Sequence, residues 1–153
     1  MKVGAVGLGS RTATVFNELL KINSNINMIA YVDPFPIGKQ LAQKNNFLPS
    51  KSYETLSEMI KNEKLDLLMI GSPNHLHLKH IKEGLEAGLK IFAEKPIVIN
   101  EEETFALAKL IKQYGQDKII VGLVLRYSQH AKSINKLLNE KKIGEIISIE
   151  GSE

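Results

Sequence analysis

Along the chain, short runs of apolar residues alternate with segments in which apolar residues recur at helical spacing. This pattern predicts strands separated by helices. Short apolar runs predict strands at residues 2–6, 27–33, 50–53, 65–71, 90–93 and 119–123. Between them, apolar residues at helical spacing predict helices near 11–22, 36–45, 56–60, 78–85, 100–115 and 128–141. The run at 65–71 is almost continuously apolar, which is typical of a strand buried on both faces. The pattern therefore predicts an α/β protein with a doubly wound parallel sheet, the Rossmann arrangement.

Two segments in the second half of the chain carry further signals of secondary structure. Asn100 with Glu103 three residues later has the capping-box pattern, and Gly115 is a helix stop. The run at 145–150 reads as a hydrophobic strand that follows a sheet already complete, and an isolated strand has nowhere to pair. We therefore predict a dinucleotide-binding domain over 1–125. Residues 126–153 are predicted to hold a linking helix and the first strand of a truncated C-terminal domain.

Composition and charge narrow the class of protein. Twenty Lys plus Arg against 17 Asp plus Glu give a net charge of +3, too small to predict a nucleic-acid or membrane-surface partner. The absence of Cys excludes disulfide scaffolds, thiolate zinc sites and Cys nucleophiles. The longest apolar run, 119–125, is far too short to span a membrane, and no signal-peptide core follows Met1. We therefore expect a cytoplasmic protein.

A glycine-rich turn joins the first predicted strand to the first helix. It reads Gly7-Leu8-Gly9-Ser10-Arg11-Thr12. In the dinucleotide-binding fingerprint the first glycine permits the tight turn and the second lets the backbone approach the pyrophosphate, which sits on the helix N-terminus. Thr12 departs from the Gly or Ala usual at the third position. Taken alone, the turn is explained as well by a simple strand–turn–helix corner.

An acidic residue ends the second predicted strand. Asp33 lies 24 residues after Gly9, where a carboxylate would accept hydrogen bonds from the adenosine ribose. The alternative is a helix N-cap, because prolines at 34 and 36 suit an early helix turn. An acid at this position repels a 2′-phosphate and favours NAD over NADP, although Arg11 and Lys39 could soften that preference and leave NADP open.

Polar residues also follow the next three strands, at the edge where α/β sheets bind ligands. They are Ser72 and Asn74, then Glu94 and Lys95, then Arg126. Each has a simpler explanation: Asn74 as a helix N-cap, Lys95 and Arg126 as solvated surface cations. Their placement at one edge, together with the glycine-rich turn, favours a binding site.

The histidines at 75, 77 and 80 resemble a metal cluster, but we predict no metal site. Only His77 and His80 share a helix face, no HExxH arrangement is present and no Cys assists. His77, early in its helix, is predicted to face the cofactor cleft.

Four motifs together resemble the Gfo/Idh/MocA family of NAD(P)-dependent oxidoreductases, the glucose–fructose oxidoreductase and inositol dehydrogenase-like enzymes. The motifs are Gly7-Leu8-Gly9, Tyr31-Val32-Asp33-Pro34, Ser72-Pro73-Asn74-His75-Leu76-His77 and Ala93-Glu94-Lys95-Pro96. The resemblance runs through the whole chain and implies a Rossmann domain followed by an α/β domain with an open antiparallel sheet. That second domain would carry the substrate pocket and the catalytic Asp and His.

The resemblance also implies roles for individual residues. Gly7, Gly9, Ser10 and Arg11 would line the pyrophosphate turn, Asp33 would bind ribose, and Ser72, Asn74, His77 and Arg126 would line the cofactor. Glu94 and Lys95 would approach the nicotinamide ribose and the substrate. Lys95 is the predicted catalytic residue, hydrogen-bonding the reacting oxygen of a sugar or polyol.

Two functions follow as hypotheses. The first is an NAD-dependent oxidoreductase that moves a hydride between nicotinamide and the carbon of a sugar or polyol hydroxyl, with this chain as the cofactor-binding half, catalytically incomplete alone. The second is a stand-alone dinucleotide-binding sensor or scaffold without catalysis. A semialdehyde dehydrogenase or dihydrodipicolinate reductase-like protein finds no support in the Glu-Lys-Pro motif. The uncovered terminal strand predicts a homo-oligomer.

Overall fold

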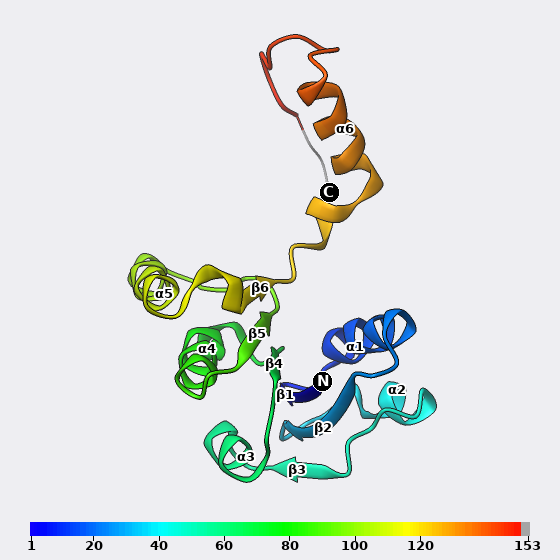
Figure 1. Cartoon of the computed structure of the whole chain (residues 1–153), viewed down its shortest axis with the longest axis vertical. Helices are drawn as coiled ribbons and strands as arrows, with labels where there is room; N and C mark the ends of the chain where they lie inside the picture. The colour runs from blue at the N-terminus through cyan, green and yellow to red at the C-terminus, as the bar shows by residue number, and fades with distance from the viewer. Residues whose placement is uncertain (151–153) are drawn as a thin grey trace. The chain divides into compact units, whose positions relative to one another are not determined.

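A computed structural model describes residues 1–150 and places six parallel strands in one sheet, in the order β3-β2-β1-β4-β5-β6. The strands are β1 (Lys2–Val6), β2 (Asn27–Val32), β3 (Lys51–Tyr53), β4 (Leu67–Ile70), β5 (Lys90–Ala93) and β6 (Ile119–Val121). The helices of this unit are α1 (Ser10–Ile22), α2 (Lys39–Lys44), α3 (Leu56–Asn62), α4 (His77–Glu86) and α5 (Glu101–Tyr114), with short 3-10 turns η1 (Asn74–Leu76) and η2 (Gln116–Lys118). The doubly wound parallel sheet predicted from the sequence is confirmed (Figure 1).

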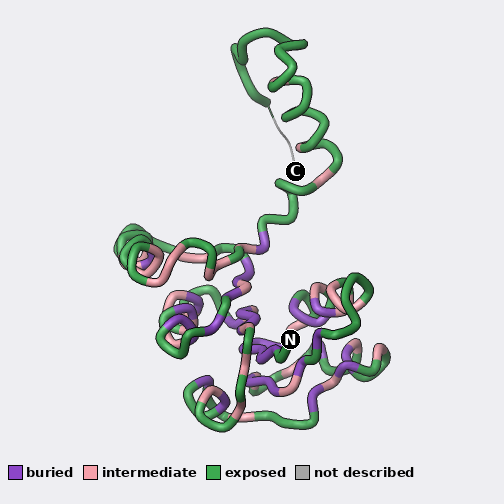
Figure 2. Tube along the Cα trace, viewed as in Figure 1, coloured by how far each residue is buried: buried purple, intermediate pink, exposed green. Residues whose placement is uncertain are grey.

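Helices cover both faces of the sheet, and each face has its own apolar core. Strand side chains pack on one face against α1 and α2, through Ala13, Phe16 and Ala42. On the other face they pack against α3, α4 and α5, through Leu56, Met59, Ile81, Leu85 and Leu107. Figure 2 shows the buried residues concentrated along the strands and the inner sides of these helices. Burial on both faces explains why the strands read as continuous apolar runs.

The helix ends behave as the local sequence predicts. Asn100 caps α5, since its Oδ1 accepts a hydrogen bond from the Glu103 amide at 2.8 Å, and the Glu103 carboxylate accepts from the Ile99 amide at 3.0 Å. Gly115 ends the helix at φ +97°, a conformation that glycine adopts most readily. The predicted cap at Asn100 is confirmed, and the reciprocal bond to Glu103 comes from the residue before the cap.

Residues Met1–Gly122 form one compact unit, and the residues from Leu123 onward form a second. The second unit contains the 3-10 turn η3 (Val124–Tyr127) and α6 (Gln129–Asn139), which Ser128 caps by accepting from the Ala131 amide at 3.2 Å.

The predicted strand at 145–150 is not formed. These residues adopt no regular secondary structure, and Ile147 and Ile149 are almost fully exposed. The physical reason is that no strand among residues 1–150 pairs with this segment, so its backbone has no ladder to join. The last three residues of the predicted 126–153 segment lie outside the described part of the chain.

Two further boundaries differ from expectation. The helix predicted from residue 36 begins at Lys39, and the last strand ends at Val121 rather than at 123. Within residues 1–150, no helix is long and apolar enough to cross a membrane.

Candidate functional site

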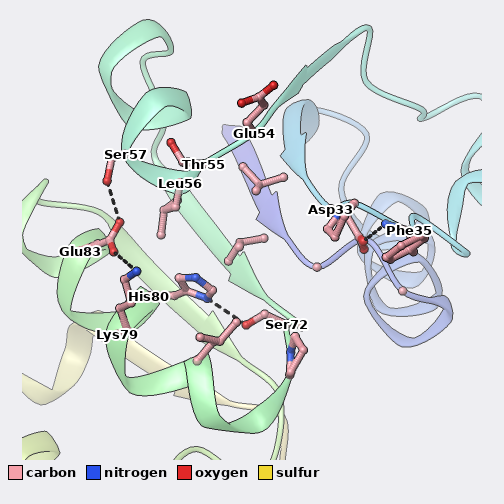
Figure 3. Close-up of a pocket in the computed structure, with 18 of the residues that line it drawn as sticks. Asp33, Phe35, Glu54, Thr55, Leu56, Ser57, Ser72, Lys79, His80 and Glu83 are labelled. Carbon is pink, nitrogen blue, oxygen red and sulfur yellow. Dashed lines mark hydrogen bonds and ion pairs between the residues drawn. The ribbon is translucent and has the colours of Figure 1, made fainter.

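A cavity of about 670 Å³ opens at the carboxyl edge of the sheet (Figure 3). Its walls are formed by the glycine-rich turn after β1, the loop after β2, the start of α3, the loop after β4, and the residues of α4 that face the cavity. Backbone amides of the residues that follow β1, β4, β5 and β6 donate to the adjacent strand, at Gly7, Gly71, Glu94 and Gly122. These bonds continue the sheet by one residue and hold the loops side by side. The cavity lies where parallel α/β sheets bind ligands.

Gly7 occupies a position that only glycine fits. Its φ is +85°, and its amide donates to the Val32 carbonyl at 2.8 Å. A side-chain carbon here would collide with the backbone of Gly71 and with the amide nitrogen of Ser72. The first glycine of the turn therefore lets β1 and β4 approach each other at the cavity floor.

Gly9 leaves open space where Gly7 leaves none. It is the N-cap of α1 with ordinary backbone angles, and no described residue beyond its chain neighbours comes within 4 Å of where a β-carbon would be. No described side chain caps the helix, and its first turn carries no acidic residue. The first amides of α1 are thus available to an anion, and the backbone can be approached closely, which fits a pyrophosphate.

Thr12, the departure from the usual fingerprint, has a compensating partner. It is 2% exposed, and it packs where a side chain on Gly71 would overlap its Oγ1. The missing side chain at the end of β4 therefore makes room for the larger residue in α1. A third glycine usually lets the helix pack closely on the strand. Here Gly71, directly after the adjacent strand β4, provides the room for that packing.

Asp33 lines the cavity at the end of β2 and is half-buried. Its Oδ1 accepts a hydrogen bond from the Phe35 amide at 2.7 Å, which makes an Asx turn, and α2 begins only at Lys39. Asp33 is therefore not the N-cap of that helix, and the second carboxylate oxygen has no hydrogen-bond partner among the described residues. A free carboxylate oxygen beside the turn fits a ribose hydroxyl.

Ser72 and Asn74 both follow β4, but they differ in their exposure and in their position relative to the cavity. Ser72 is buried, lines the cavity and has its Oγ 2.9 Å from Nδ1 of His80. Asn74 is exposed at the start of η1 and caps no helix, since the η1 N-cap is Pro73 with no side-chain bond among the described residues. The capping role that was the alternative for Asn74 is not observed.

His77 lies behind the cavity wall, which differs from the expectation that it faces the cleft. Its ring is 1% exposed, with Nε2 2.7 Å from the carbonyl oxygen of Ser72 and Nδ1 2.8 Å from that of Pro96. His77 thus ties the loop after β4 to the loop after β5. Residue 80, one turn further, is the histidine that lines the cavity.

Glu94 and Lys95 follow β5, and they differ in exposure. Glu94 is 7% exposed and pairs with Arg11, whose Nε lies 3.3 Å from Oε1. Lys95 is exposed, and the peptide bond between it and Pro96 is cis. Arg11 is therefore engaged with the loop after β5 and does not line the cavity beside Asp33. Arg126 is exposed in η3 of the second unit.

The sequence analysis missed several cavity residues that follow from the same rule of strand ends. They are Phe35 after β2, Thr55 and Ser57 at the start of α3 after β3, and Lys79, His80 and Glu83 on α4. Thr55 and Ser57 follow the carboxyl end of β3, which lies at the same edge of the sheet. Leu76, His80 and Glu83 recur at helical spacing, and that pattern is visible in the sequence.

The α4 wall of the cavity is polar. Burial lowers the pKa of the His80 imidazole, an effect that the nearby Glu83 carboxylate opposes. Glu83 accepts a hydrogen bond from Ser57 Oγ at 3.1 Å, and the Lys79 ammonium lies 4.0 Å from its other oxygen. Within residues 1–150, no three His, Cys, Asp or Glu side chains gather in a way that could hold a metal ion.

A parallel doubly wound sheet with this turn, this acid and this cavity defines a dinucleotide-binding class of protein. Comparison with known families agrees: the model of the Gfo/Idh/MocA oxidoreductase family, described as having an NAD-binding Rossmann fold, matches residues 1–123. The chain belongs to that family.

Individual proteins that match the chain share only about a quarter of its residues. An inositol 2-dehydrogenase of Corynebacterium glutamicum (strain R) is 24% identical over 99% of this chain and 44% of its own length. A 2,7-anhydro-N-acetylneuraminate hydratase of Escherichia coli (strain K12) is 24% identical over 95% of this chain and 37% of its own. The crystal structure of scyllo-inositol dehydrogenase from Lactobacillus casei with bound NAD(H) and scyllo-inositol superposes with a TM-score of 0.81 at 26% identity, covering 95% of this chain and 43% of that one. The chain spans less than half the length of each of these relatives.

Proposed function

We propose that the chain is the cofactor-binding half of an NAD-dependent oxidoreductase that transfers a hydride between nicotinamide and the hydroxyl-bearing carbon of a sugar or polyol. The observation that carries the proposal is the uncapped N-terminus of α1 beside the open Gly9 and the free oxygen of Asp33, at one cavity. The nicotinamide ring, when bound, supplies the hydride chemistry, and the protein orients it.

Different residues of the described chain would bind different parts of the cofactor. The turn through Gly7, Gly9 and Ser10 would hold the pyrophosphate on the α1 amides, and Asp33 would hold the adenosine ribose. Ser72 and Asn74 would line the cofactor at the loop after β4. His77 would act from behind this wall, because both of its ring nitrogens lie within hydrogen-bond distance of carbonyl oxygens in the two loops.

Charge supports NAD in preference to NADP. The Asp33 carboxylate would repel a 2′-phosphate at the ribose that it contacts. Arg11, the nearest cation of the turn in sequence, is paired with Glu94, so it would not offset that repulsion. Lys39 is exposed at the start of α2 and is a cation that could soften it.

Residues of the loop after β5 would contact the groups that take part in the hydride transfer. Glu94, held by Arg11, would contact the nicotinamide ribose. The family resemblance also makes Arg126 a proposed cofactor residue. Lys95 is exposed directly beyond Glu94, so its ammonium is free to hydrogen-bond the reacting oxygen and stabilise its alkoxide character. Lys95 is therefore our proposed catalytic residue.

The substrate class rests on the relatives, two of which are inositol dehydrogenases by name. We propose that residues after 125 lead into a substrate domain, as the lengths of these relatives suggest. The exposed Ile146, Ile147 and Ile149 support burial of this segment in an assembled protein, which we expect to be a homo-oligomer.

Lys95→Ala tests the catalytic role in the protein that carries the substrate domain. With myo- and scyllo-inositol as substrates, we expect turnover to fall by about 10²- to 10⁴-fold, because the general acid/base group is lost. NADH affinity should stay within about twofold, because the cavity walls do not include this side chain. Stopped-flow absorbance of NADH formation measures the first quantity and calorimetry the second.

Lys90→Ala is the matched control, since Lys90 is also exposed but begins β5 at the opposite edge of the sheet. Turnover that survives Lys95→Ala would refute the proposed role. A wild-type protein that binds NADH and oxidises none of a panel of polyols would favour the non-catalytic sensor instead.

A further inference from the structure

The cavity has a polar wall on α4 that the pyrophosphate and ribose of the proposed cofactor would not use. Helix α4 presents His80 and Glu83 to the cavity, one helical turn apart, opposite Asp33 (Figure 3). Leu56 and Leu76 add apolar surface beside them. A flat aromatic base needs apolar contact on its faces and hydrogen bonds only at its edge, and this wall offers both.

His80 directs one ring nitrogen into the cavity. Its Nδ1 lies 2.9 Å from Ser72 Oγ, whereas Nε2 has no hydrogen-bond partner among the described residues. No side-chain nitrogen or oxygen in the described chain is both buried and without a partner. Since His80 is half-buried and lines the cavity, its Nε2 opens to the cavity space.

The bond to Ser72 determines what Nε2 offers. Burial lowers the pKa of His80, so the ring is neutral at pH 7 and carries one N–H. When the buried Ser72 hydroxyl donates to Nδ1, its hydrogen is satisfied and the ring hydrogen sits on Nε2. In the opposite tautomer that hydroxyl would accept from Nδ1–H, and its own hydrogen would find no acceptor among the described residues, which is costly for a largely buried group. Nε2–H is therefore a donor that faces the cavity.

Glu83 supplies the complementary acceptor. Ser57 Oγ donates to one carboxylate oxygen, and Lys79 lies near the other. A carboxylate has about four lone-pair sites, so acceptor capacity remains. The wall thus presents a donor from His80 and an acceptor from Glu83, three residues apart on the same helix face.

We propose that His80 and Glu83 read the edge of the dinucleotide's base and select adenine, an inference that rests on the proposed NAD-binding function. Adenine places the N1 acceptor next to its 6-amino donor, which matches the Nε2–H donor and the carboxylate acceptor. Hypoxanthine reverses this pattern, with an N1–H donor next to the O6 acceptor, so its O6 would face the Glu83 carboxylate. A reversed pair leaves buried polar groups unmatched, which weakens binding.

The test compares NADH with reduced nicotinamide hypoxanthine dinucleotide, which differs only at this edge, by calorimetric titration of the 153-residue chain. We expect NADH to bind on the order of tenfold more tightly. Glu83→Gln should remove most of this difference, because an amide can either donate or accept. His80→Phe keeps a ring but loses the donor, and it should weaken NADH toward the hypoxanthine analogue.

Glu86→Gln is the matched control, because Glu86 lies on the same helix, is exposed and pairs with Lys82 away from the cavity. It should keep the full tenfold difference. Equal affinity of the wild-type chain for the two dinucleotides would overturn the proposal while leaving the NAD-binding function intact, as would an unchanged difference in Glu83→Gln. A chain that binds neither dinucleotide would overturn the proposed function and this inference together.

Discussion

Gly7→Ala is expected to lower the free energy of unfolding of the sheet unit by about 2–6 kcal/mol, because two penalties add. The residue has φ +85°, which costs an L-amino acid about 1–3 kcal/mol. Its side-chain carbon would also overlap the backbone at Gly71 and Ser72, where no flexible side chain can move aside, and overpacking adds about 1–3 kcal/mol. Urea denaturation followed by circular dichroism measures the loss.

Gly9→Ala is the matched control, with the opposite expected pattern. Its backbone angles are ordinary and the surrounding space is open, so the free energy of unfolding should change by less than about 0.5 kcal/mol. NADH affinity should nevertheless fall on the order of tenfold, about 1.4 kcal/mol, because the new methyl group fills the approach to the α1 amides. Equal unfolding energies for the two variants would contradict this account of the turn.

His77→Ala is expected to lower the free energy of unfolding by about 3 kcal/mol. The substitution removes a ring that is 1% exposed, which leaves a cavity where α4 packs on the loops after β4 and β5. It also removes the imidazole nitrogens that lie 2.7 Å and 2.8 Å from the carbonyl oxygens of Ser72 and Pro96, so the carbonyl that accepts the ring N–H loses that hydrogen bond. The same denaturation experiment measures this loss.

His75→Ala gives the comparison for His77. It is exposed in η1, two residues away, and forms no hydrogen bond with the described residues, so its removal should change the unfolding energy by less than about 0.5 kcal/mol. A His77→Ala protein as stable as His75→Ala would show that the bridge between the two loops contributes nothing to folding.

The sequence predicts the sheet and much of the site edge because those features depend on local signals. Apolar runs mark the strands, Asn100 and Glu103 mark a helix start, and the turn at Gly7 marks the β1–α1 corner. Because the sheet is parallel, all strands end at the same edge, so residues far apart in sequence can be assigned to one site. This reasoning places Asp33 and Ser72 together, and both line the cavity.

What the sequence does not predict depends on contacts between distant residues. The helix predicted from residue 36 starts at Lys39, because the Asp33 carboxylate holds the Phe35 amide in a turn. Thr12 looks unfavourable until Gly71 is seen opposite it. His77 shares a helix with His80, but only tertiary packing shows which ring is buried against carbonyl groups and which one opens to the cavity.

The central claim, an NAD site at this edge of the sheet, is tested most directly by calorimetric titration of the chain with NADH and with NADPH at fixed salt. We predict saturable NADH binding that is tighter than NADPH binding. Asp33→Ala should lower NADH affinity by about 10- to 100-fold, through loss of charged hydrogen bonds to the ribose, and should reduce the discrimination against NADPH. Absence of NADH binding, or NADH affinity unchanged in Asp33→Ala, would contradict the account.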